Sequence, residues 1–187
     1  MKIRDSAMPE REMWETFFKP KAVLATLGIN KQIKDVVEFG CGYGTFTIPA
    51  SQMIGGTVYA LDIEPGMISV AADAAKKQGL NNVRTILRDF VTEGSGLPDE
   101  SMAYAMLFNI LHLEHPEVLI GEAKRVLKKN GKLGVIHWNY DPLTPRGPAM
   151  EIRPTQEDCW GWIENAGFHS LQRYDLRPYH YGIVAIK

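Results

Sequence analysis

The chain has 187 residues, of which 45% are hydrophobic and 23% charged, a composition that excludes intrinsic disorder as the main state. Its formal net charge of −1 excludes an overall positive field, so we expect neither nucleic acid nor an anionic membrane as a partner. No apolar run approaches the roughly 18 residues of a membrane helix, and the charged segment 1–15 lacks a signal core, so we expect a cytoplasmic protein.

The first predicted element is a helix over 9–27, with Trp14, Phe17 and Phe18 on one side. Lys19-Pro20-Lys21 is expected to interrupt or kink it, because proline lacks an N–H and disfavours helix in the residue before it. The aromatic side has two interpretations: a lid over a ligand site, or the buried face of an ordinary amphipathic helix.

Strand and helix patterns then alternate, which predicts a parallel sheet covered on both faces. A Pro-rich loop over 141–154 separates this alternation from a helix and an expected antiparallel strand pair at the end of the chain. The expected strands are 35–39, 57–61, 83–87, 102–108, 132–138, 168–176 and 181–186. One helix is expected to begin at Thr45, and three more are expected over 65–78, 116–127 and 156–165.

The strongest motif is the segment Val36-Val37-Glu38-Phe39-Gly40-Cys41-Gly42-Tyr43-Gly44, in which a buried strand leads into alternating glycines and a helix. Glycine allows positive φ and a close approach of the backbone to a ligand. A helix N-terminus presents unpaired N–H groups. The segment therefore predicts a binding edge at the carboxyl end of a parallel strand. The alternative is a tight strand-to-helix turn that binds nothing.

Two acids follow the next two strands. Asp62 closes the second strand, where an acid that binds both ribose hydroxyls is expected; the alternative is a helix N-cap or a surface acid. Asp89 follows the third strand, and it either accepts a hydrogen bond from an exocyclic amine such as that of adenine or is a solvated loop residue. The loop spacing G-x-G-x-G differs from the G-x-G-x-x-G of nicotinamide sites.

At this point the chain resembles the class I S-adenosylmethionine (SAM)-dependent methyltransferases, and among them the small-molecule group that includes the ubiquinone and menaquinone methylases. The resemblance extends from Asp35 to Trp138. The segments that carry it are 38–44, 60–67, 88–90, 107–112 and 122–133.

The resemblance implies an α/β fold, a Rossmann-like three-layer sandwich with a seven-stranded, mostly parallel sheet in the order 3-2-1-4-5-7-6 and strand 7 antiparallel. It implies one domain over 1–187, with a helical cap (1–30), a cofactor-binding core (35–138) and a C-terminal helix and hairpin (139–187). The cofactor is SAM, and the product is S-adenosylhomocysteine (SAH).

The resemblance also implies the cofactor contacts. Glu38, Gly40 and Gly42 would line the methionine end, and Cys41 between them would also contact the cofactor. Asp62 would hold the ribose, Ile63 and Met67 would pack on the adenine, Asp89 and Phe90 would lie at its edge, and Asn109 would face the sulfonium.

The methyl acceptor is expected to be a small molecule. Asn109-Ile110-Leu111-His112 stands where base and amide methylases carry Asn-Pro-Pro-Tyr or Asp-Pro-Pro-Tyr. The short chain shows no large inserted substrate domain, so the acceptor pocket is expected from the N-terminal helix and the loops after strands 4 and 5.

His112 and His137 follow or end strands 4 and 5, and they are the candidates for a general base. The alternative for each is a structural histidine. The five histidines and two cysteines show no metal-binding spacing, so we expect no metal.

The sequence is also compatible with two other functions: a nicotinamide-dependent oxidoreductase, and a non-catalytic SAM-binding partner subunit. No residue pattern demands an oligomer.

Overall fold

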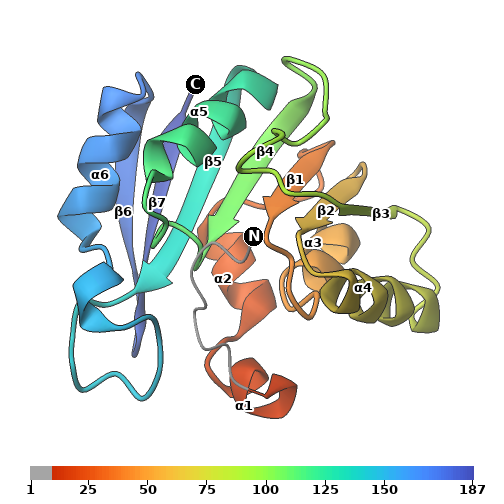
Figure 1. The fold of residues 1–187 in the computed structure, drawn as a ribbon. Coiled ribbons are helices and arrows are strands. Elements are labelled where there is room, and N and C mark those ends of the chain that lie inside the picture. Colours follow the sequence, from red (N-terminus) through yellow and green to blue (C-terminus); the bar gives the residue numbers. More distant parts are fainter. Residues whose placement is uncertain (1–9) are drawn as a thin grey trace.

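A seven-stranded sheet runs through the computed structural model, which describes residues 10–187 (Figure 1). The strand order is β3-β2-β1-β4-β5-β7-β6, and β7 runs antiparallel to both of its neighbours, β5 and β6, whereas all other pairs are parallel. This confirms the expected fold class. The strands are β1 (Val36–Phe39), β2 (Val58–Asp62), β3 (Val83–Leu87), β4 (Met102–Phe108), β5 (Leu127–Trp138), β6 (His169–Leu176) and β7 (His180–Ile186).

Helices cover both faces of the sheet, because successive residues of a strand point to opposite sides and both sides here are apolar. Val36 faces a core shared with the N-terminal helices and α3, while Val37 faces the core under α5 and α6. The helices are α1 (Arg11–Thr16), α2 (Pro20–Thr26), α3 (Thr47–Met53), α4 (Pro65–Lys77), α5 (Pro116–Val126), η1 (Met150–Ile152, 3-10) and α6 (Gln156–Asn165).

The N-terminal helical segment is split at Pro20, as the sequence predicted. Pro20 is the first residue of α2, a position where its missing N–H costs nothing. In Figure 1, α1 lies at the end of the sheet to which the β4 and β5 arrows point. No helix within residues 10–187 is long and apolar enough to cross a membrane.

The junction of α5 and β5 differs from the prediction. A helix to Leu127 and a strand from Lys132 were expected, but α5 ends at Val126 and β5 already begins at Leu127. Leu127 pairs with Met102, and the register then shifts before Tyr104 pairs with Lys132. Asn130 takes a left-handed conformation (φ 62°) in the extra residues, so the predicted turn became an irregular segment of the strand.

Glu122 of α5 holds the loop between β3 and β4. Its carboxylate accepts hydrogen bonds of 2.6 Å from the backbone N–H and the hydroxyl of Ser95, and of 2.7 and 2.8 Å from Arg125. Partial burial opposes ionisation, but the hydrogen bonds from Arg125 and Ser95 outweigh it and lower the pKa of Glu122 to about 2.

Replacing Glu122 by Gln should lower the free energy of unfolding at pH 7 by about 1.5 kcal/mol, because hydrogen bonds to a charged group are lost. A carboxyl with a depressed native pKa stabilises the fold above its unfolded value of about 4.3 and loses that effect as pH falls toward 2. Chemical unfolding between pH 7 and 2 should therefore show the two proteins converging at low pH. The exposed Glu117→Gln on the same helix is the control, and a constant gap at all pH values would contradict the ionic role of Glu122.

Candidate functional site

The glycine loop lies where β1 ends, between the carboxyl ends of β2 and β4. Gly40 and Cys41 both donate backbone hydrogen bonds of 2.9 Å to the carbonyl of Leu61, which ties the loop to β2. Gly40 has φ 75°, and a Cβ there would lie 2.7 Å from Ile110 Cδ1. The backbone conformation therefore favours glycine at this position, and a Cβ would also displace the end of the Ile110 side chain.

Asp62 closes the loop from the side of β2. One carboxylate oxygen accepts the N–H of Gly42 at 2.9 Å, and the other accepts the N–H of Glu64 at 3.0 Å. The Asp62 side chain thus fixes the middle of the glycine loop against the start of α4. Each oxygen keeps a further lone pair for a ligand hydroxyl.

Glu38 and Asp62 carry two buried carboxyl groups near the carboxyl ends of β1 and β2. Their exposed fractions are 2% and 8%. Burial, opposed by a hydrogen bond from the Thr47 hydroxyl and helped by the charge of Asp62, raises the pKa of Glu38 to about 8. Burial also raises the pKa of Asp62, against the pull of its backbone hydrogen bonds. Two buried acids hydrogen-bonded to neutral groups favour a cationic ligand, whose charge would offset the cost of ionising them.

Asn109, which follows β4, has a buried polar side chain whose hydrogen-bonding groups could bind a ligand. Its backbone is left-handed (φ 54°) and is anchored by a 2.7 Å hydrogen bond from its N–H to the carbonyl of Ile136. Both polar atoms of its side chain are buried and have no hydrogen-bond partner among the described residues. Buried amides are rarely left unpaired, so a bound molecule with polar groups fits here.

The other predicted cofactor residues take several positions. Ile63 and Met67 are half-buried around the start of α4, and Asp89 uses its carboxylate to accept the N–H groups of Val91 and Thr92, both at 3.3 Å.

Two of the predicted cofactor residues turn their side chains into the core. Phe90 packs edge-on against Phe39, with ring centroids 5.4 Å apart. Cys41 packs with Ala60 and Ala71, and burial raises the pKa of its thiol.

The two predicted catalytic histidines lie together at the end of β5. His112 Nδ1 and His137 Nε2 are 3.4 Å apart, and both side chains are buried. Burial, and then the neighbouring His112, hold the pKa of His137 well below its usual range. Residues 10–187 contain no group of three or more His, Cys, Asp or Glu that could hold a metal ion.

An aromatic cluster joins the N-terminal helices to the ends of β5 and β7. Phe17 lies 5.2 Å from Trp138, and Phe18 lies 4.4 Å from His180, measured between ring centroids. Phe18 is buried and Trp14 is half-buried in the same cluster. The aromatic side predicted from the sequence therefore packs over this edge of the sheet.

Sequence reasoning missed Arg153, which organises the loop after β5. Its buried guanidinium donates to the carbonyls of Asn139, Asp141 and Pro148 at 2.8 to 3.1 Å, and also to Thr144. Nothing in the sequence around Arg153 signals this role, because its partners are backbone carbonyls that only the folded loop brings together.

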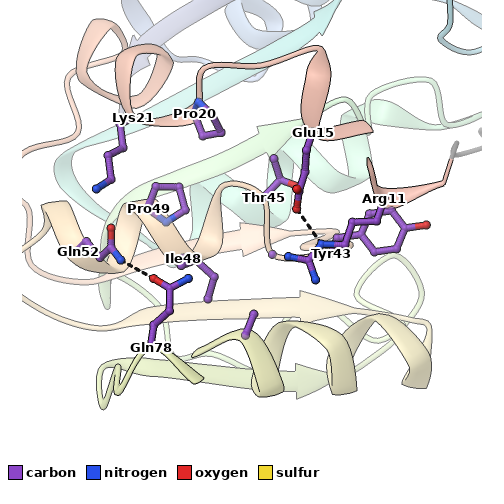
Figure 2. Close-up of a pocket in the computed structure, with 12 residues that line it drawn as sticks. Arg11, Glu15, Pro20, Lys21, Tyr43, Thr45, Ile48, Pro49, Gln52 and Gln78 are labelled. Atoms are coloured by element: carbon purple, nitrogen blue, oxygen red, sulfur yellow. Dashed lines mark hydrogen bonds and ion pairs between the residues drawn. The ribbon is translucent and has the colours of Figure 1, made fainter. Parts of the chain in front are cut away.

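A pocket of about 450 Å³ separates α1 and α2 from α3, α4 and the glycine loop (Figure 2). It meets the loop through Tyr43, Gly44 and Thr45. The Thr45 hydroxyl is buried and has no hydrogen-bond partner among the described residues. Two side-chain pairs border the pocket, Arg11 with Glu15 and Gln52 with Gln78, each 2.7 Å apart.

Residues 36–131 match the family model described as a methyltransferase domain. The chain belongs to the class I SAM-dependent methyltransferases. The crystal structure of a SAM-dependent methyltransferase from Aquifex aeolicus is 27% identical, with a TM-score of 0.84 over 95% of this chain and 93% of that chain. SAM is the cofactor of this family.

Two curated relatives show how far the likeness reaches. The ubiquinone/menaquinone biosynthesis C-methyltransferase of Rhizobium meliloti is 29% identical over 159 residues, which cover 81% of this methyltransferase and 57% of the relative. Aklanonic acid methyltransferase from a Streptomyces species is 30% identical over 101 residues, covering 52% and 45%. The chain spans about half the length of the curated relatives it matches.

Replacing Glu38 by Gln should stabilise the ligand-free methyltransferase at pH 8. A carboxyl with a raised native pKa binds more protons folded than unfolded, so its presence lowers stability as pH rises from about 4.3 toward 8. Gln cannot ionise and should remove this part of the decline. Thermal unfolding from pH 5 to 8 measures it, with the exposed Glu93→Gln as the control. Parallel declines in the parent and in Glu38→Gln would show that the native carboxyl ionises normally.

Proposed function

We propose that this methyltransferase transfers the methyl group of SAM to a small-molecule acceptor. The observation that carries the proposal is the pair of buried acids, Glu38 and Asp62, beside the Gly42 backbone. SAM has a sulfonium, an ammonium and a ribose diol, which are the groups that two buried carboxyls and a loop of backbone N–H groups suit. The unpaired amide of Asn109 supports the same assignment.

In the proposed site, Glu38 and the backbone of Gly40, Cys41 and Gly42 hold the methionine end of the cofactor. Asp62 accepts hydrogen bonds from the ribose hydroxyls with its remaining lone pairs. Asn109 borders the sulfonium.

The adenine is assigned to the surface around the start of α4. Ile63 and Met67, both half-buried, pack against its faces. Asp89 accepts from its exocyclic amine, and Phe90 supports that edge from the core through its contact with Phe39.

Bound SAM supplies a methyl group that is already activated by the sulfonium. The chain's task is to orient the acceptor in line with the methyl carbon and to exclude water, and orientation alone contributes up to roughly 7–11 kcal/mol in favourable reactions. We assign the acceptor to the edge formed by Asn109, the His112–His137 pair and the aromatic cluster around Trp138. Arg153 stabilises the loop behind that edge.

A small molecule is the acceptor class that these features favour. The acceptor edge is lined by aromatic rings and by the buried imidazoles of His112 and His137, which suit a largely apolar molecule. The names of the ubiquinone/menaquinone and aklanonic acid methyltransferases refer to small organic compounds, which supports this class for the present chain.

Calorimetry should show SAH binding to the parent protein that Asp62→Ala weakens by about 10- to 150-fold. This factor corresponds to the roughly 1.5–3 kcal/mol of hydrogen bonds to a charged group. Asp62→Asn should give a smaller loss, because the amide oxygen still accepts one bond. The exposed Asp73→Ala on α4 is the matched control and should bind as the parent does.

NADH is titrated into the same samples. Binding of NADH without SAH would replace the proposal with a nicotinamide oxidoreductase. Equal SAH affinity in the parent and in Asp62→Ala would remove Asp62 from the ribose site.

Radiolabelled methyl SAM incubated with the protein and a metabolite extract should label compounds that pass a filter of about 3 kDa. Label in the retained protein or nucleic acid fraction would contradict a small-molecule acceptor. Asp62→Ala should slow labelling in proportion to its lost affinity when SAM is below saturation. Absence of label in every fraction, with normal SAH binding, would favour the non-catalytic partner subunit.

A further inference from the structure

The backbone of Trp138 fixes one nitrogen of His137. The Trp138 N–H donates a 3.0 Å hydrogen bond to His137 Nδ1. The β4–β5 pairing ends at Phe108 and Ile136, so this amide lies just beyond the part of β5 that β4 covers. An imidazole nitrogen that accepts a backbone N–H carries no proton, so His137 Nδ1 is unprotonated.

The surroundings of His137 keep the ring neutral. The side chain is fully buried and stacks on Tyr181, with ring centroids 6.2 Å apart. His112, His180 and Arg153 are the charged or titratable groups that act on it, and each opposes a positive charge. A neutral imidazole has one proton, which must then be on Nε2.

That proton faces the second ring. His137 Nε2 lies 3.4 Å from His112 Nδ1, so His137 donates and His112 accepts. His112 Nδ1 is then unprotonated as well, so the ring proton of His112 is on its Nε2. A doubly protonated His112 would place two N–H groups face to face across this distance, which is unfavourable.

We propose that His137 is a positioning residue that fixes the tautomer of His112, and that neither imidazole removes a proton from the methyl acceptor. His112 then carries its proton on Nε2 and uses Nδ1 as an acceptor, so neither nitrogen is left as a base. Two hydrogen bonds in series, here called the relay, run from the Trp138 amide to His137 and from His137 to His112 at the end of β5. No proton is transferred along it.

Because the relay leaves neither imidazole as a base, it limits which methyl acceptors can react. This inference rests on the proposed function. The acceptor brings a nucleophilic atom whose electron pair is already available at neutral pH, such as that of an enol acidic enough to be ionised there. Methyl transfer to it is balanced without either imidazole, because the acceptor lone pair forms the new bond while the electron pair of the broken S–C bond stays on sulfur.

Long-range ¹H–¹⁵N correlation spectra of the uniformly ¹⁵N-labelled, ligand-free protein at pH 7.5 test the relay directly. Both histidines should show a protonated Nε2 and an unprotonated Nδ1. Assignment comes from spectra of His112→Gln and His137→Gln. A proton on Nδ1 of either ring, or a mixture of tautomers at His112, would overturn the proposal.

A matched pair of variants separates positioning from simple packing. His137→Gln can donate an N–H from about the same position and should keep the single His112 tautomer. His137→Met fills the space without a donor and should give mixed His112 tautomers. Retention of one tautomer in a folded His137→Met would also overturn the proposal. If that variant does not fold, the spectrum of the parent protein still decides.

Titration of SAH into the same labelled sample tests the proposed function separately from the tautomers. Absence of SAH binding would remove the proposed function and leave the tautomer result intact. The reverse outcome, binding with the wrong tautomers, would remove only the relay.

Discussion

The hydrogen bond from the Gly42 N–H to Asp62 is the interaction on which the candidate site depends. It joins the middle of the glycine loop to the end of β2, and the second Asp62 oxygen holds Glu64 at the start of α4. Loop, strand and helix are thereby fixed relative to one another by a single side chain. Because the Gly40 and Cys41 amides bind the Leu61 carbonyl beside it, the loop has no room to shift along β2. Its left-handed glycines make this path accessible.

The same arrangement lowers the stability of the protein when no ligand is bound. Glu38 and Asp62 are both buried, and burial opposes ionisation of each. Asn109 adds an unpaired buried amide and a left-handed backbone. Such features lower stability and persist at sites where a ligand restores the balance. The neutral Thr47 hydroxyl bonded to Glu38 fits this view, since a permanent cation at that point would compete with a cationic ligand.

Much of the fold could be predicted from the sequence, because the spacing of apolar residues and the positions of glycine and proline determine helices, strands and turns locally. Glycines at 40, 42 and 44 and an acid at the end of the next strand fix the edge where a ligand would bind, whatever the distant contacts are. The predicted boundary between α5 and β5 was wrong because Leu127 extends the strand by pairing with Met102, a partner far away in sequence. The side-chain directions of Cys41 and Phe90, and the clamp made by Arg153, likewise depend on tertiary contacts that no local pattern encodes.

Charge is distributed unevenly along the site, and this bears on how such a site would act. The acids lie at β1 and β2, whereas the end of β5 carries neutral imidazoles and aromatic rings. In a transfer from a sulfonium, positive charge on the donor is lost as the methyl group moves. Carboxylates beside the methyl would stabilise the starting cation more than the transition state and would slow the reaction. In the proposed site Glu38 and Asp62 contact the methionine end and the ribose and not the methyl group, so their contacts would change little during the transfer. Rings without charge near the methyl group would then leave the transition state as the better-bound species. In the proposed site, the separation of acids from imidazoles would therefore combine tight cofactor binding with rapid transfer.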